Sequence, residues 1–179
     1  APKRDASGKP YSGRFFAAYD TAHAQQYDAA IAEWEDRKNG DLKDYWPRSA
    51  IPYGFMTAVA NSDICENYGF THWWTMFNPR QLLVQAQLLK AIVEVGAYEW
   101  QVREYVLGAY QQYLRNQNMF CFWDISRDCL APHLSNNNYH PKNNVVENCV
   151  FPVLGRGNWA SCVEGILEGR EWAVQPWES

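Results

Sequence analysis

Residues 77–93 read FNPRQLLVQAQLLKAIV and contain the most complete helix signal in the chain. Asn78 is a residue type that caps helices, Pro79 suits the first helical position, and Gln81 stands where a capping-box partner reaches back. Apolar side chains then recur at three- and four-residue intervals along one stripe, namely Leu82, Leu83, Ala86, Leu89, Ile92 and Val93. The pattern predicts a helix that begins directly after Asn78 and is interrupted at Gly96.

Three further segments predict helices because their apolar residues recur at the same spacing. The first follows Arg14 and ends at Asn39-Gly40, where the glycine is expected to form a left-handed turn; its apolar face holds Phe16, Tyr19, His23, Tyr27, Ile31 and Trp34. The second covers 99–116, through Val102, Val106, Ala109, Tyr110 and Tyr113. The third covers 158–172, through Trp159, Val163, Ile166 and Leu167, and we expect it to pack on the strands.

Two short runs rich in aromatic or β-branched residues predict strands, at 119–123 (MFCFW) and 144–151 (NVVENCVF). A polar loop is predicted between them, and a long aromatic-rich irregular segment at 44–77. The expected fold is therefore α+β and predominantly helical, with three or four helices, a small two- or three-stranded β element and this long loop. Residues 1–13 read as a flexible lead-in and 14–179 as a single domain.

The composition limits the possible partners of the chain. Its 179 residues carry a net charge of −4, so the whole chain does not attract phosphates and DNA could be contacted only through a local patch. Nine Trp and eleven Tyr predict a core dominated by aromatic packing. Because no 18-residue apolar run occurs and the first segment is polar, we expect no membrane span, no signal peptide and a cytoplasmic protein.

The five cysteines are not spaced as a zinc ribbon or a redox pair. They stand at Cys65, Cys121, Cys129, Cys149 and Cys162. The favoured interpretation is reduced, half-buried thiols of a cytosolic protein. The alternative is a scattered metal site that includes His133 or His140.

Residues 155–160 (GRGNWA) follow a strand-like run and match a loose G-x-G-x-x-A cofactor fingerprint. A dinucleotide or AdoMet fold needs a second strand whose acidic end residue holds the ribose. Only 19 residues follow Ala160, and they read as a helix and a tail. We therefore favour a glycine turn before a capped helix, while a complete small methyltransferase remains the alternative.

Asn78-Pro79-Arg80-Gln81 starts like the Asn/Asp-Pro-Pro-aromatic motif with which amino-methyltransferases hold a flipped base. Arg80 and Gln81 replace the proline and the stacking ring that this chemistry needs. The helix cap is therefore the favoured interpretation. No G-x-S-x-G or equivalent nucleophile motif occurs, so the sequence predicts no self-contained active site.

The most polar stretch of the chain is 135–144, SNNNYHPKNN. Asn side chains can read adenine edges, Tyr and His can stack on bases, and Lys can meet phosphate. The residues with these roles are Asn136, Asn137, Asn138, Tyr139, His140 and Lys142. Ordinary Asx turns use the same residue types and are the favoured alternative.

Five segments together resemble the middle of the large adenine-specific DNA methylases of bacteria and archaea. They are YWPRSAIPYGFMT (45–57), GFTHWWTMFNPRQLLVQAQLLKAI (69–92), YLRNQNMFCFW (113–123), SNNNYHPKNNVVENCVF (135–151) and GRGNW (155–159). Proteins of this family carry an N-terminal domain of unknown function, often a zinc ribbon, and some are encoded among anti-phage genes. The resemblance covers the chain from about residue 14 to its end.

The resemblance implies a non-catalytic central region, because in the family this segment lies between the AdoMet-binding motif and the catalytic motif. Both motifs are missing here. The chain would then bind no cofactor itself, AdoMet would belong to the parent methylase, and the partners would be the remainder of that methylase and DNA. The first residue is Ala rather than Met, which also agrees with a fragment.

The aromatic residues before Asn78 are the expected contact surface. In this hypothesis residues 68–80 pack on the methylase core or line its DNA cleft through His72, Trp73, Trp74 and Phe77, with Arg80 and Lys142 as phosphate contacts. One alternative is that the rings fill the core of this domain. Another is a self-contained protein-interaction module that binds through the same loop.

Overall fold

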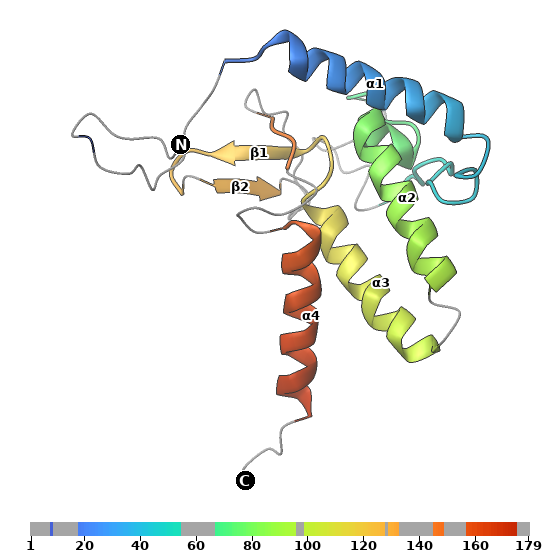
Figure 1. Ribbon diagram of the computed structural model, residues 1–179, viewed down its shortest axis with the longest axis vertical. Helices are drawn as coiled ribbons and strands as arrows, with labels where there is room; N and C mark the ends of the chain where they lie inside the picture. The colour runs from blue at the N-terminus through green and yellow to red at the C-terminus, as the bar shows by residue number, and fades with distance from the viewer. Residues whose placement is uncertain are drawn as a thin grey trace.

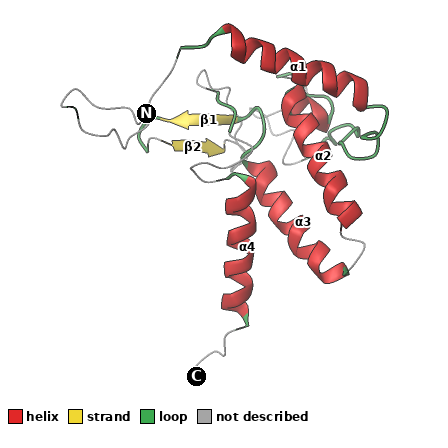
Figure 2. Ribbon diagram, viewed as in Figure 1, coloured by secondary structure: helices red, strands yellow, loops and turns green. Residues whose placement is uncertain are grey.

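The computed structural model describes residues 8, 18–54, 67–95, 99–127, 129–132, 145–148 and 157–174. These residues contain the helices α1 (Thr21–Arg37), α2 (Pro79–Val95), α3 (Trp100–Arg115) and α4 (Trp159–Ala173), and one short 3-10 helix, η1 (Trp73–Met76). The strands β1 (Cys121–Asp124) and β2 (Cys129–Pro132) pair antiparallel. The fold is α+β and predominantly helical, so the predicted fold class is confirmed (Figure 2).

The helices pack in sequence order, α1 on α2, α2 on α3 and α3 on α4. Figure 1 shows α1 lying across the upper end of α2, while α2, α3 and α4 extend downwards from the level of the β hairpin. α4 therefore packs on α3, and the expectation that it covers the strands is wrong. Its apolar positions Trp159, Val163 and Ile166 pack with Tyr110 and Tyr113 of α3 in one apolar cluster.

α1 is shorter than the periodicity predicts at its N-terminal end. Asp20 caps it, since the Asp20 carboxylate accepts from the His23 N–H at 3.0 Å and the Asp20 N–H donates to His23 Nδ1 at 3.3 Å. Tyr19 thus precedes the helix, and Phe16 lies outside the described residues. The helix ends at Arg37, and Gly40 does not have a positive φ, so the predicted left-handed stop is wrong.

α2 begins as predicted, at Pro79 behind a reciprocal capping box. The Gln81 N–H donates to Asn78 Oδ1 at 2.9 Å, and the Asn78 N–H donates to Gln81 Oε1 at 3.0 Å. Substitution of such a cap by Ala costs about 1 kcal/mol. The predicted apolar stripe is buried or half-buried except at Val93, which is 44% exposed.

Three apolar clusters hold the elements together. The first lies between α1 and α2 and consists of Trp34, Leu42, Leu82, Leu83 and Ala86. The second joins α2, α3 and α4 and consists of Ile92, Ala109, Tyr110, Tyr113 and Cys162. The third lies under η1 and consists of Ile51, Met76 and Phe120. Each cluster contains at least one buried aromatic residue, but aliphatic residues outnumber the aromatic one in the first.

The β element differs from the prediction. β1 occurs near the predicted strand 119–123, but it pairs with β2, which lies inside the segment predicted to be a polar loop. In the described part of 144–151, residues 145–148, the chain forms an isolated bridge between Val145 and Phe122, and the Val146 N–H donates to the Cys121 carbonyl at 3.0 Å. Both edges of β1 are therefore occupied at its start.

Candidate functional site

The aromatic segment before α2 is held by backbone pairing to residues 49–51. The Ile51 N–H donates to the Thr71 carbonyl at 3.0 Å, and the Trp73 N–H donates to the Ser49 carbonyl at 3.2 Å. The segment then turns through η1, whose Met76 carbonyl accepts from the Met119 N–H at 2.9 Å. The rings of this segment are thus fixed in position from two sides.

The rings divide between the core and the surface. Phe70 packs on Phe120 with ring centroids 4.9 Å apart, and Trp73 and Phe77 are half-buried against the third apolar cluster. Trp74 is 41% exposed, and its ring lies 6.5 Å from that of half-buried His72. The candidate surface is therefore narrower than the whole loop and centres on Trp74.

Glu147 connects the start of α2 to a segment 67 residues further along the chain. Arg80 donates to both Glu147 oxygens, from Nε at 2.9 Å and from Nη2 at 2.6 Å, and Asn78 Nδ2 donates to Oε2 at 3.1 Å. We refer to Asn78, Arg80 and Glu147 as the α2 clamp. The hydrogen bond with Glu147 raises the pKa of the Arg80 guanidinium. Because Glu147 neutralises this charge, only the remaining edge of the guanidinium is left for another anion.

Arg80 also borders a surface hollow between α1 and α2. Its guanidinium carbon lies 5.1 Å from the centroid of the Tyr27 ring, a distance typical of a cation–π contact. The hollow has a volume of about 470 Å³ and is lined by Ala18, Tyr19, His23, Tyr27 and Arg80. The helical periodicity assigns these rings to the buried face of the first helix, whereas Tyr19 is 74% exposed.

The glycine turn before α4 has a structural cause. Gly157 has a φ of +78°, and a Cβ there would lie 2.6 Å from Asn116 Cγ. Its N–H donates to Ser161 Oγ at 3.0 Å, and Asn158 Oδ1 caps α4 by accepting from the Ser161 N–H at 2.9 Å. Residue 157 must therefore be a glycine because it lies against Asn116 at the C-terminal end of α3. This supports the interpretation of the segment as a glycine turn before a capped helix. Gly155 and Arg156 lie outside the described residues.

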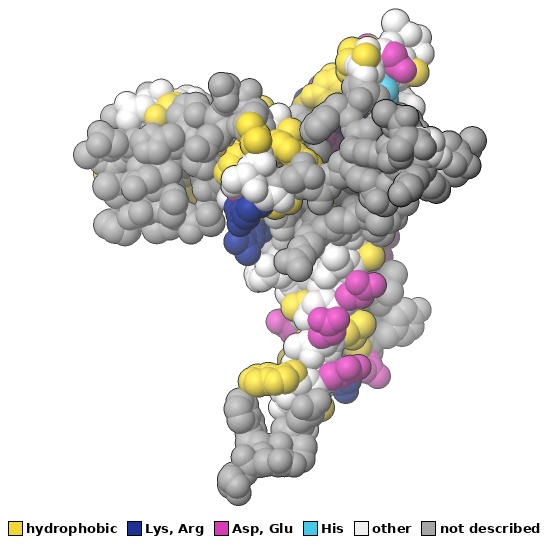
Figure 3. Space-filling view, turned by 90° about the vertical axis from the view of Figure 1, so that its left-hand side faces the viewer, with side chains coloured by type: hydrophobic (Ala, Val, Ile, Leu, Met, Phe, Trp, Pro, Cys, Tyr) yellow, Lys and Arg dark blue, Asp and Glu magenta, His cyan; other side chains and the backbone are white. Residues whose placement is uncertain are grey.

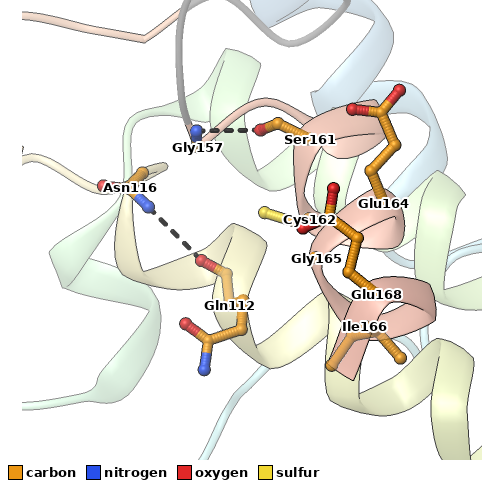
Figure 4. Close-up of a pocket in the computed structure, with 9 residues that line it drawn as sticks. All are labelled: Gln112, Asn116, Gly157, Ser161, Cys162, Glu164, Gly165, Ile166 and Glu168. Carbon is orange, nitrogen blue, oxygen red and sulfur yellow. Dashed lines mark hydrogen bonds between the residues drawn. The ribbon is translucent and has the colours of Figure 1, made fainter. Parts of the chain in front are cut away.

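A groove of about 600 Å³ lies between the end of α3 and α4. Figure 4 shows Cys162, Asn116 and Gln112 on its inner side, with Glu164 and Glu168 on α4. Figure 3 shows acidic side chains gathered along α4 with hydrophobic ones between them. Burial raises the pKa of the Cys162 thiol, so the reactive thiolate of this residue is disfavoured.

The predicted metal alternative finds no support in the described ranges, where no three His, Cys, Asp or Glu side chains are grouped to hold an ion. Cys121, Cys129 and Cys162 are free thiols there, and burial raises the pKa of Cys121. The remaining candidates lie outside the described residues, namely Cys65, Cys149, His133, Asn136, Asn137, Asn138, Tyr139, His140 and Lys142. Their proposed contacts stay predictions.

Glu147 is the contact residue that sequence reasoning missed. It lies in the run NVVENCVF, where an acidic residue among β-branched neighbours is the one available signal. No helix in the described part of the chain combines the length and apolar character needed to cross a membrane. Comparisons of the chain with protein-family models, curated proteins and solved structures found no match.

Proposed function

We propose that this chain is a non-catalytic scaffold that positions DNA within an adenine-specific DNA methylase. The observation that carries the proposal is how the side chains of Asn78-Pro79-Arg80-Gln81 are bonded, since this tetrapeptide lies in one of the segments that resemble the family. Its three polar side chains are engaged in the capping box and the α2 clamp. Groups held in this way serve as a frame, because the side-chain amides of Asn78 and Gln81 are engaged in the cap and are not available to hold a flipped base.

The frame holds Trp74 and Arg80 at fixed positions relative to each other. Met76 is buried in the core between them, and the clamp fixes the start of α2 immediately behind. Trp74 stays 41% exposed beside this rigid point. In the proposed assembly the methylase core covers this surface and supplies the AdoMet and catalytic groups.

Salt-dependent DNA binding tests the proposal, because each phosphate neutralised by a cation releases a counterion. The assay is the fluorescence anisotropy of a labelled duplex titrated with the chain between about 50 and 200 mM salt. Since the net charge is −4, we expect a local patch with few phosphate contacts, and a slope of log K against log salt near −2 to −4 at about −0.9 per phosphate.

A matched pair of lysine variants locates the patch. Lys142→Gln is expected to make the slope less steep by about 1. Lys38→Gln is the control, because Lys38 is paired with Glu35 at the end of α1. Undetectable DNA binding, or binding with no salt dependence, contradicts the proposal.

The second candidate is a protein-interaction module, and the exposure of Trp74 favours it. This function predicts salt-insensitive binding to a protein partner that Trp74→Ala weakens by at least tenfold, since buried tryptophans dominate interface energies. Trp100→Ala is the control, because Trp100 is 65% exposed on α3. A partner that binds both variants equally well excludes protein binding through Trp74.

A further inference from the structure

Three ring side chains at four-residue spacing, Tyr19, His23 and Tyr27, lie along one side of the start of α1. His23 and Tyr27 are four residues apart in α1 and so lie on the same helix face, while Tyr19 precedes the helix and lines the same hollow. Tyr19 and His23 are exposed and Tyr27 is half-buried, and none of the three belongs to the apolar clusters that hold the fold together. Core packing therefore does not account for this row of rings.

The capping geometry of α1 holds part of this row in place. His23 Nδ1 accepts from the Asp20 N–H at 3.3 Å, which fixes the imidazole at the first turn. The Tyr19 ring stacks on it with centroids 5.9 Å apart and an interplanar angle of 28°. Each ring covers one face of the other, so the outer faces of this stack are the surfaces left for another planar group.

Arg80 comes from α2 and lines the hollow beside Tyr27. The guanidinium lies over the Tyr27 ring, and the bidentate pair with Glu147 fixes its plane. Glu147 balances the Arg80 charge and Asp20 lies beside His23, so the described residues that line the hollow supply no net positive charge with which to hold a phosphate alone. Its walls instead offer stacking faces and hydrogen-bonding edges, which are the features that recognise a planar heteroaromatic ring.

The volume fits such a ligand. About 470 Å³ lies within the range of roughly 300–1,000 Å³ that is typical of small-molecule sites. The hollow is open to the surface, so a ring that stays attached to a polymer can enter it from one side.

We infer that the hollow between α1 and α2, formed by Tyr19, His23, Tyr27 and Arg80, binds an unstacked nucleobase of single-stranded DNA. Stacking on aromatic side chains is the usual means of holding such bases, and it tolerates any base because each has a π face. The inference rests on the proposed function and adds to it a base-binding site apart from the predicted phosphate contact at Lys142. We name the site the α1 base groove.

A fluorescent base analogue reports directly on this stacking. The probe is a single-stranded oligonucleotide that contains 2-aminopurine, whose emission falls when the base stacks on an aromatic ring. With the unsubstituted chain we expect saturable quenching. Tyr19→Ala and Tyr27→Ala each remove a stacking face, so we expect a loss of affinity of about tenfold, within the range seen when one stacked ring is removed. Tyr19→Phe retains the ring and is expected to retain quenching.

Tyr105→Ala is the matched control, because Tyr105 is a half-exposed tyrosine on α3. Tyr19 precedes α1 and is 74% exposed, so Tyr19→Ala is expected to leave the fold intact, which circular dichroism checks. If Tyr19→Ala and Tyr27→Ala bind DNA with the same quenching and affinity as the unsubstituted chain, the α1 base groove does not bind the base. The proposed function would still stand. Undetectable DNA binding by the unsubstituted chain overturns both. Tyr19-dependent binding of a proline-rich peptide in place of the oligonucleotide also overturns the inference.

Discussion

Asn78→Asp tests the α2 clamp, because it preserves the helix cap and changes only the contact with Glu147. Asp caps helices as well as Asn does, and its charge gains about 0.3–1 kcal/mol at a helix N-terminus. The substitution removes the Nδ2 donor that lies 3.1 Å from Glu147 Oε2 and places a second carboxylate there. The lost bond to a charged acceptor and the repulsion, partly offset by Arg80, together amount to about 2 kcal/mol. The net cost we expect is therefore about 1 kcal/mol.

The assay is urea unfolding followed by tryptophan fluorescence, performed on a double-mutant cycle with Glu147→Gln. In the Glu147→Gln background the repulsion is absent, so Asn78→Asp is expected to be neutral or stabilising. The effect of Asn78→Asp on the free energy of unfolding thus depends on which residue occupies position 147. Equal effects in both backgrounds, with a coupling energy below about 0.3 kcal/mol, would show that Asn78 and Glu147 do not meet.

Other predictions concern a glycine pair and an acidic side chain. Gly157→Ala is expected to destabilise the chain by about 2 kcal/mol or more, because it puts a Cβ against Asn116 at a positive φ. Gly165→Ala, in open space on α4, should stabilise it by about 0.5–1 kcal/mol, and thermal unfolding of both variants checks the pair. Hydrogen bonds from Arg37 and then Lys90 lower the pKa of Asp41, so its contribution to stability is present above about pH 4 and lost as the pH falls. Asp41→Asn should therefore be less stable than the unsubstituted chain at pH 7, and the difference between the urea unfolding midpoints should shrink progressively as the pH falls below about 4, towards the lowered pKa of Asp41. A difference that persists unchanged at low pH would contradict the role assigned to this ion pair.

Local signals in the sequence were sufficient to predict α2. Asn78, Pro79 and Gln81 each favour the same helix start, and the apolar stripe behind them agrees, so propensity and packing do not conflict. The start of α1 was harder, because the apolar spacing continues through Tyr19 although Asp20 and His23 form a capping box that begins the helix later. The capping box therefore sets the first residue of α1, whereas the spacing of apolar residues does not.

Long-range pairing could not be predicted from local patterns. β2 contains Leu130, Ala131 and Pro132, which lack a clear strand signal, and it forms because β1 offers it an antiparallel partner after a short turn. The contact between Arg80 and Glu147 depends likewise on how the chain returns to α2 after 67 residues. Of the rings expected to form the contact surface, Trp74 is exposed, while Trp73 and Phe77 are half-buried on the core, and their role as contacts stays a prediction.

The central claim is that these residues form a frame and that methyl transfer belongs to other parts of a methylase. Calorimetric titration of AdoMet into the chain tests this claim most directly. Because the Gly157 N–H donates to Ser161 Oγ and the close approach of Asn116 accounts for the missing side chain, we expect no saturable heat of binding. A one-site isotherm with micromolar affinity would contradict the account and would establish the glycine turn as part of a cofactor site.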